Sequence, residues 1–234
     1  MTAGDDEDTR PKAAARQPAP LAQDANAQDP RAILAAVRAA YDARDRELHE
    51  KYDRHLPFQD AIFDRWERAR SLGFEEGANI YHSAVVLGTV KVGAFTWIGP
   101  YVMLDGSGGI SIGAYCAIST GVHIYSHEAL QWSVSGGKFK PSRAPVKIGD
   151  HTYIGSQALI DMGVTIGSRS IVAANSFVNT NVPDNTIVGG SPARVIGRVR
   201  FDGDRPIMDF DARPRRRPAV ARPKRKPAPP RRRR

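Results

Sequence analysis

His127 is the side chain in this sequence best suited to acid–base chemistry. It lies in the segment IYSHE, which runs from Ile124 to Glu128. An imidazole has a pKa near neutrality, so it can take a proton from a hydroxyl or an amine as that group attacks a carbonyl carbon. From its spacing alone, however, His127 is better interpreted as a solvated surface residue. The elements that surround it decide between the two interpretations.

Two carboxylates and one thiol could take part in such chemistry. Glu128 could orient His127, but adjacent side chains on a strand point to opposite faces, so we interpret Glu128 as the first residue of a loop. Asp105 stands beside a glycine-rich segment and is interpreted as a corner residue. Cys116, the single cysteine, excludes an intrachain disulfide and a multi-thiolate metal site. It could be an acyl-accepting nucleophile, but its small inward position in the repeat described next predicts a packed residue.

A six-residue repeat organises most of the chain around these residues. Its first position is aliphatic throughout, with a two-residue slip at Gly106–Gly109 and an interruption after Ile124. The position four residues later is usually small or β-branched, as at Thr96 and Ala158, and the residue after the aliphatic one is often Gly. The aliphatic positions are Ile80, Val86, Val92, Ile98, Leu104, Ile112, Ile118, Ile124, Ile148, Ile154, Ile160, Ile166, Val172 and Val178.

A period of six is typical of a β-solenoid. Each hexad forms a short strand and a corner, and three hexads complete one triangular coil. The second inward residue must be small because the prism is narrow, and glycines are expected where corners need a tight turn or a positive φ. Coils stack through backbone hydrogen bonds at about 4.8 Å, so the fourteen hexads predict four to five coils. In this phase His127 points outward.

The N-terminal part of the chain lies outside the repeat. Residues 1–30 are rich in Ala, Gln, Asp and Pro and are expected to be disordered. Residues 31–75 are expected to be helical, because apolar residues recur on one face and Pro57 then ends or interrupts the helix. A second short helix should end at Gly73 and bury a stripe formed by Ile62, Phe63 and Trp66.

Two further segments interrupt or follow the solenoid, which is expected to occupy residues 76–200. Residues 128–147 carry no hexad phase, and a loop of this length inside a regular solenoid is usually functional. Residues 201–234 are expected to form a short extension and a disordered polybasic tail, since prolines interrupt its run of charges.

The formal charge of +9 is concentrated in the tail. Residues 211–234 hold 12 Lys and Arg against one Asp, or +11, which leaves −2 for residues 1–210. The tail could attract an anionic membrane surface or an acidic partner, or act as a solubilising appendage, and it lacks the aromatic residues that would favour nucleic acid. An acidic N-terminus and the absence of any apolar run of about 18 residues favour a cytoplasmic protein.

Three segments of the chain resemble the hexapeptide-repeat acyltransferases, the family of galactoside, maltose and serine O-acetyltransferases and polysaccharide-modifying relatives. They are IYSHE, APVKIGDHTYIG (Ala144–Gly155), and the stretch from VAANSFV to VPDNTIVGGSPARVIG (Val172–Gly197). The resemblance covers about residues 80–200. It implies a left-handed parallel β-helix, a homotrimer, and acyl-CoA bound in clefts between subunits. His127 matches the position of the family's catalytic histidine.

The same resemblance indicates a donor site. Many members have Trp where this chain has Tyr153, so the donor contact at that position is not carried over. The loop residues Trp132, Lys138 and Lys140 are expected to reach the cleft of a neighbouring subunit. The residues that match the donor region, followed by two arginines placed to meet phosphates, are Gly155, Ser156, Ala173, Ala174, Asn175, Arg194 and Arg198.

The resemblance therefore predicts an acyl-CoA-dependent acyltransferase without a metal. Direct O-acetylation of a sugar, glycolipid or polysaccharide precursor is the expected reaction, and N-acylation of an amino sugar is the nearest alternative. A zinc enzyme similar to a β-helical carbonic anhydrase, with His82, His123 and His127 as ligands, stays open, although the ligand spacing of such enzymes is not reproduced. A catalytically silent trimeric scaffold also stays open.

Overall fold

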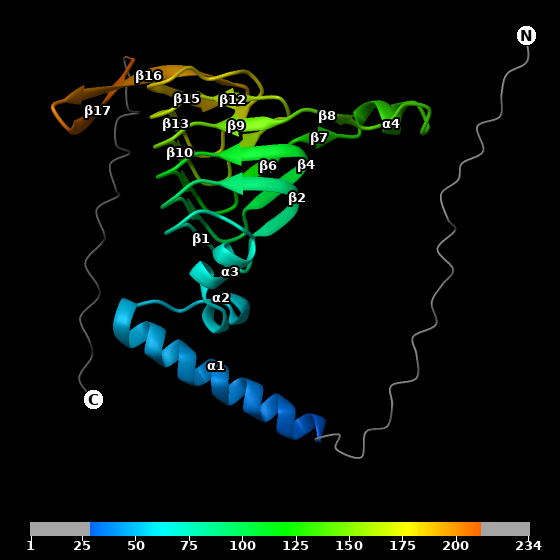
Figure 1. Ribbon diagram of the computed structural model, residues 1–234, viewed down its shortest axis with the longest axis vertical. Helices are drawn as coiled ribbons and strands as arrows, with labels where there is room; N and C mark the ends of the chain where they lie inside the picture. Colours follow the sequence, from blue (N-terminus) through cyan, green and yellow to red (C-terminus); the bar gives the residue numbers. More distant parts are fainter. Residues whose placement is uncertain (1–28, 212–234) are drawn as a thin grey trace, which may run out of the picture. The chain divides into compact units, whose positions relative to one another are not determined.

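The structure, a computed structural model, describes residues 29–211 (Figure 1). The chain divides into two units, Met1–Arg54 and His55–Arg234. The disorder predicted for residues 1–30 and for the polybasic tail falls almost entirely on residues outside the described ones, so it stays a prediction.

The described part of the first unit is one long helix, α1 (Pro30–Tyr52). Asp29 caps it by accepting a hydrogen bond from the backbone N–H of Arg31 at 3.0 Å. Pro30 suits the first turn, because its missing N–H would have no partner there. Asp53 adopts a left-handed conformation and ends the helix before the chain reaches Pro57, the residue that the sequence suggested as its end.

The second unit begins with two short helices, α2 (Phe58–Ile62) and α3 (Arg65–Ser71), in place of the single one expected. The break lies at Phe63, which is extended, and Asp64 then caps α3. The predicted buried stripe is wrong, because Phe63 and Trp66 are 51% and 42% exposed. The buried residues of these helices are Asp60, Ala61 and Ala69. Gly73 follows the end of α3 with φ +72°, as expected of a stop.

From Asn79 onward the chain winds into a three-sided prism of parallel strands. The first face consists of β1 (Asn79–Ile80), β3 (Trp97–Ile98), β5 (Ala117–Ile118), β10 (Tyr153–Ile154), β13 (Ile171–Val172) and β15 (Thr186–Gly190). The second face consists of the first halves of β2 (Val85–Val92) and β4 (Met103–Ile112), then β6 (His123–Tyr125), β11 (Leu159–Ile160) and β14 (Phe177–Val178). The third face consists of the second halves of β2 and β4, then β9 (Val146–Ile148), β12 (Thr165–Ile166) and a bridge from Ile166 to Val182.

Three additions depart from this regular prism. An excursion leaves after the second face through β7 (His127–Glu128), α4 (Leu130–Val134) and β8 (Ser142–Arg143). At the far end, β16 (Ala193–Asp202) pairs antiparallel with β15 and then with β17 (Arg205–Phe210), so a hairpin extends the first face. Figure 1 shows both the excursion and the hairpin projecting from the stacked coils.

The hexad positions form the core as the repeat predicts. Every aliphatic first position is buried except Val86, which is partly buried and packs against the core. The small inward residues at the corner between the third and first faces bond to the next coil. Thr96 donates to the carbonyl of Gly113 at 2.7 Å, and Thr152 donates to that of Gly167 at 3.0 Å. Cys116 lies in this column, with Sγ 3.1 Å from the Gly149 carbonyl, so it is a packed residue.

The glycines that follow the aliphatic residues have a different role from the positive φ expected of them. None of them has a positive φ, but a Cβ on Gly93 would lie 2.7 Å from the backbone of the next coil, and one on Gly155 would lie 2.5 Å away. The positive φ falls two residues later, on Phe95, Tyr101, Tyr115, His151, Gln157 and Arg169. Glycine is therefore needed where two coils approach each other closely.

This close approach predicts a specific loss of stability. Gly93→Ala should lower the free energy of unfolding by about 2–3 kcal/mol, because the added methyl meets rigid backbone. The matched control Gly136→Ala places a methyl in open space at φ +65° and should cost about 1 kcal/mol, from the left-handed conformation alone. Urea unfolding measures both, and a Gly93→Ala loss no larger than that of the control would contradict the interpretation.

Candidate functional site

His127 lies at the corner between the second and third faces, where the excursion leaves the prism. It pairs with Arg143 in the short β7–β8 ladder, which forms the base of the excursion. The predicted outward position is observed, since the side chain of His127 is 35% exposed. The ladder and the prism hold the imidazole from two sides and leave one edge open to solvent.

Asp105 lies beside His127 on the neighbouring coil. β4 pairs with β6 so that Asp105 is opposite Tyr125, two residues before His127. Asp105 Oδ2 is 2.7 Å from His127 Nδ1. The contact is close but is not aligned as a linear hydrogen bond, a geometry that catalytic groups often show before substrate binds. The tautomer whose proton is on Nδ1 faces the carboxylate of Asp105 and leaves the lone pair of Nε2 free to accept a proton.

The carboxylate of Asp105 is buried and ionised. Its Oδ1 accepts hydrogen bonds from the hydroxyl of Ser107 at 2.6 Å and from the backbone N–H of Ser107 at 3.1 Å. Burial raises the pKa of Asp105, but the hydrogen bonds from Ser107 and the electrostatic interaction with His127 outweigh it and hold the pKa below its usual value. The carboxylate therefore stays charged next to the imidazole at neutral pH.

The interpretation of Asp105 as a simple corner residue was incomplete. It does lie at a corner, but it is the carboxylate that contacts His127. Glu128 instead sits in the β7–β8 ladder opposite Ser142. The register that places Leu104 beside Ile124 was the signal that could have identified Asp105, because it carries Asp105 to the same corner as His127.

Ser126 is a further residue of this corner that the sequence did not indicate. It is fully buried, its hydroxyl donates to the Asp105 carbonyl at 2.6 Å, and it accepts from the Gly108 N–H at 2.7 Å. A Cβ on Gly108 would lie 2.3 Å from the Ser126 carbonyl oxygen. The glycine-rich slip therefore lets the chain fold against Ser126 and aims Asp105 at the imidazole.

The predicted donor residues gather at a different corner, between the first and second faces. Asn175 donates its backbone N–H to the Ser156 carbonyl at 2.9 Å, and Gly155 packs closely on Ala174. Ala173 lies beside Gly189 of the next coil. We call this set, Gly155, Ser156, Ala173, Ala174 and Asn175, the small-residue corner.

The two arginines are not equivalent in their positions. Arg194 is exposed and opposite Gly189, at the end of β15 that adjoins the small-residue corner. Arg198 is opposite Thr186, at the other end of β15, and its guanidinium donates to the Thr186 hydroxyl at 2.8 Å. The structure brings Arg194 to the corner and leaves Arg198 on the far side of the face.

The excursion residues lie away from the small-residue corner of their own chain. Trp132 is on α4, and Lys138 and Lys140 follow it in an exposed segment. Figure 1 shows α4 at the end of the excursion, beyond the strands of the prism. Their predicted contact with a neighbouring subunit remains a prediction.

The three histidines considered as zinc ligands do not converge within one chain. His82 stacks on Phe63 with ring centroids 4.7 Å apart, and His123 Nδ1 lies 3.1 Å from the Tyr125 hydroxyl. Within residues 29–211, no group of three or more His, Cys, Asp or Glu side chains is arranged to hold a metal ion. Cys116 is also unsuited to nucleophilic chemistry, because burial raises the pKa of its thiol.

Comparison with known proteins identifies the family. Residues 145–180 match the model of the hexapeptide repeat of succinyl-transferase. WcaF of Escherichia coli (strain K12), an acetyltransferase assigned to colanic acid biosynthesis, is 31% identical over 134 residues, which cover 51% of this chain and 69% of WcaF. The chain belongs to the hexapeptide-repeat acyltransferase family. The predicted left-handed parallel β-helix is confirmed, and the structure also contains the predicted N-terminal helical segment.

Other members of the family share shorter stretches or lower similarity. The serine acetyltransferase of Escherichia coli (strain K12) is 35% identical over 114 residues, which cover 49% of this chain and 40% of that enzyme. A hexapeptide-repeat acetyltransferase of Vibrio cholerae, solved with acetyl coenzyme A, is 29% identical with a TM-score of 0.49, over 73% of this chain and 91% of that one.

This acyltransferase has no helix within residues 29–211 that could span a bilayer.

The electrostatics of Asp105 predict a pH dependence of the enzyme's stability. A carboxylate whose pKa is lower in the folded state stabilises that state above its unfolded pKa, near 3.8, and stops doing so as the pH falls through the folded value. Asp105→Asn should therefore be less stable than the parent protein at neutral pH, and the difference should shrink below about pH 4. Urea unfolding at several pH values measures it, with Asp204→Asn at the exposed hairpin turn as the control. A difference that is constant from pH 7 to pH 3 would contradict the prediction.

Proposed function

We propose that this acyltransferase moves an acyl group, in the first place acetyl, from coenzyme A to a hydroxyl of a sugar, glycolipid or polysaccharide precursor. The observation that carries the proposal is the contact between His127 Nδ1 and the buried carboxylate of Asp105. It supplies a base, fixed in orientation, at the exposed edge of the prism.

In the proposed mechanism, Nε2 of His127 takes the proton of the acceptor hydroxyl as its oxygen attacks the thioester carbonyl. A backbone or loop donor at the site stabilises the negative charge on the tetrahedral oxygen. The intermediate collapses, the C–S bond breaks, and the coenzyme A thiolate leaves and recovers the proton. Asp105 stabilises the imidazolium that exists between these steps. Transfer is direct, because the Cys116 thiol is buried and an acyl-enzyme on it has no route to the acceptor.

The coenzyme is placed on the small-residue corner, with Arg194 meeting its phosphates. The absence of large side chains there lets an extended pantetheine arm approach the backbone. Relatives of known structure include one solved with acetyl coenzyme A. The role of Arg198 in phosphate binding is less direct, because its guanidinium is engaged by Thr186 at the far end of β15.

A complete site then needs two copies of the chain. His127 and the small-residue corner lie on different corners of one prism, and the whole second face separates them. The outward side chains support burial of two faces in a homotrimer, since Trp97 on the first face and Val85 and Leu87 on the second are exposed and apolar. The third face is polar, with Lys91, Ser111, Lys147 and Thr165 outward. In such a trimer, Trp132 and Lys138 of the excursion would reach the cleft of the neighbour.

The acceptor is proposed from the relatives. WcaF is assigned to colanic acid biosynthesis, and a galactoside O-acetyltransferase of Escherichia coli (strain K12) is 42% identical over 55 residues, 24% of this chain and 27% of that one. N-acylation is the second candidate, because an N-acetyltransferase of Staphylococcus aureus is 48% identical over 56 residues. The same base serves an amine, so a screen of sugars and amino sugars for thiol release distinguishes the two.

Removal of the imidazole tests the proposed base. His127→Ala should lower kcat by about 10²–10⁴-fold, because a positioned general base contributes that much. The fold and the oligomeric state should be unchanged. Release of the coenzyme A thiol, followed with a chromogenic disulfide, measures the rate. The matched control is His123→Ala, which removes an exposed histidine from the adjoining strand β6 and should keep parental activity. Near-normal turnover of His127→Ala would refute the assignment.

Mixed oligomers test whether two chains build one site. His127→Ala and Ala174→Arg should each be inactive, the second because the arginine blocks the small-residue corner. Co-expression should restore about a quarter of the parental activity, since that share of the interfaces in a random closed assembly joins an intact histidine to an intact corner. The activity of the purified mixture is compared with that of each variant alone. If the mixture stays inactive while both variants assemble, the two-chain site is wrong.

A further inference from the structure

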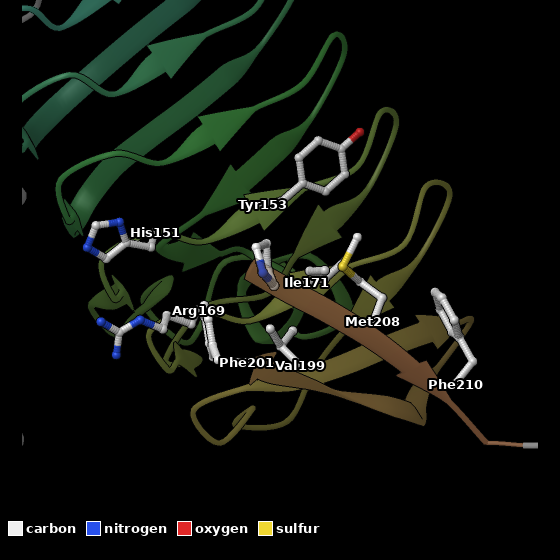
Figure 2. A pocket seen from close by; sticks show the side chains of 9 residues that line it. His151, Tyr153, Arg169, Ile171, Val199, Phe201, Met208 and Phe210 are labelled. Carbon is white, nitrogen blue, oxygen red and sulfur yellow. The ribbon is translucent and has the colours of Figure 1, made fainter. Parts of the chain in front are cut away.

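A pocket of about 730 Å³ lies between the first face of the prism and the C-terminal hairpin (Figure 2). Tyr153 and Ile171 form its wall on the prism. Its opposite wall consists of Val199, Phe201, Pro206, Met208 and Phe210 from the hairpin. His151 and Arg169 complete the lining. The volume is within the range of about 300–1,000 Å³ that is usual for pockets that hold small molecules.

The hairpin turns its apolar side toward this pocket. Val199 pairs with Met208 and Phe201 pairs with Pro206, so these side chains share one side of the two-stranded ribbon. The other side carries Arg200, Ile207 and Asp209, and Arg200 Nε lies 3.0 Å from Asp209 Oδ2. A ribbon that only extended the sheet into solvent would not need an apolar side. The segregation therefore indicates that the inner side contacts something apolar.

One end of the pocket is cationic. Arg169 lies with Cζ 5.6 Å above the ring of Phe201, and Figure 2 shows the two side chains together at the end opposite Phe210. His151 stacks on Tyr115 from the neighbouring coil, 5.4 Å between centroids. Within the described part of the chain Arg169 forms no ion pair with an acidic side chain, and the lining includes two basic residues and no acidic one. The guanidinium is thus available to an anion at the mouth of an apolar cavity.

We propose that this pocket binds the hydrocarbon chain of an anionic amphiphile, with its carboxylate or phosphate against Arg169. The hydrocarbon chain lies between Ile171 and Met208 and extends toward Phe210. The head group meets the guanidinium of Arg169, whose N–H groups can bind either a carboxylate or a phosphate. This site is separate from the His127 chemistry and does not depend on it. Its residue Tyr153 nevertheless precedes Gly155, the first residue of the small-residue corner, by only two residues.

Equilibrium dialysis with radiolabelled decanoate and decyl phosphate tests the proposal, with acetate and 1-decanol as comparison ligands. The full-length protein should bind both anionic amphiphiles saturably, decanol more weakly and acetate not measurably. Whichever of the two anions binds more tightly then identifies the head group as a carboxylate or a phosphate. Arg169→Gln should lower the affinity for both anions by about tenfold and leave the affinity for decanol unchanged. Met208→Ser should lower the affinity for decanoate, decyl phosphate and decanol by a similar factor, because it removes apolar contact with their hydrocarbon chains.

Two matched controls lie on the other side of the same ribbon. Arg200→Gln removes an exposed arginine, and Ile207→Ser removes an apolar residue next to Met208 that is similarly exposed. Both variants should bind the three ligands with the affinity of the parent protein. Absence of saturable decanoate and decyl phosphate binding would overturn the proposal, as would equal losses in Met208→Ser and Ile207→Ser. It would also be overturned if Met208→Ser changed only the sedimentation coefficient, since the apolar side of the hairpin would then be a contact between copies.

Discussion

The structure depends on one constraint, which is that each coil must stay hydrogen-bonded to its neighbouring coils. Pairings such as that of Tyr153 with Ala117 and Ile171 fix the height of each residue along the prism. Inward positions therefore fall in columns, and the narrow interior accepts only aliphatic and small side chains. The same pairing decides which outward residues become neighbours. Core and candidate site are thus set by a single register.

What could be predicted from the sequence follows from this constraint. The periodic residues, for example Ile118 and Ile154, reveal the prism because their pattern is local in the chain. His127 was identified through a short motif, which is also local. The contact with Asp105 was not, because it requires the register between successive coils and the effect of the Gly106–Gly109 slip. Phe63 and Trp66 were wrongly predicted to be buried, because an apolar stripe shows that a side can be covered but not that anything covers it.

The two irregularities of the repeat occur at the same corner of consecutive coils. The slip lets the chain after Asp105 fold back, so that Ser107 and Ser126 bond to its side chain and its carbonyl. The excursion begins on the next coil, with His127 in its first strand. A regular corner has no room for a buried carboxylate, since small inward residues and closely approaching glycines fill it. The departure from the repeat is therefore what creates a polar site with a buried carboxylate at the edge of an apolar prism.

The rigidity of the prism also limits how the proposed chemistry can be arranged. Columns of buried residues such as Leu104 and Ile124 hold the second face flat, so no local movement can bring His127 to the small-residue corner of its own chain. A flexible enzyme could close a domain around its substrates, whereas a solenoid can only present one corner to another. Under the proposed mechanism, the distance between base and donor is therefore set by how two copies pack. The apolar outward residues of the first and second faces then serve catalysis as well as assembly, because they fix that distance.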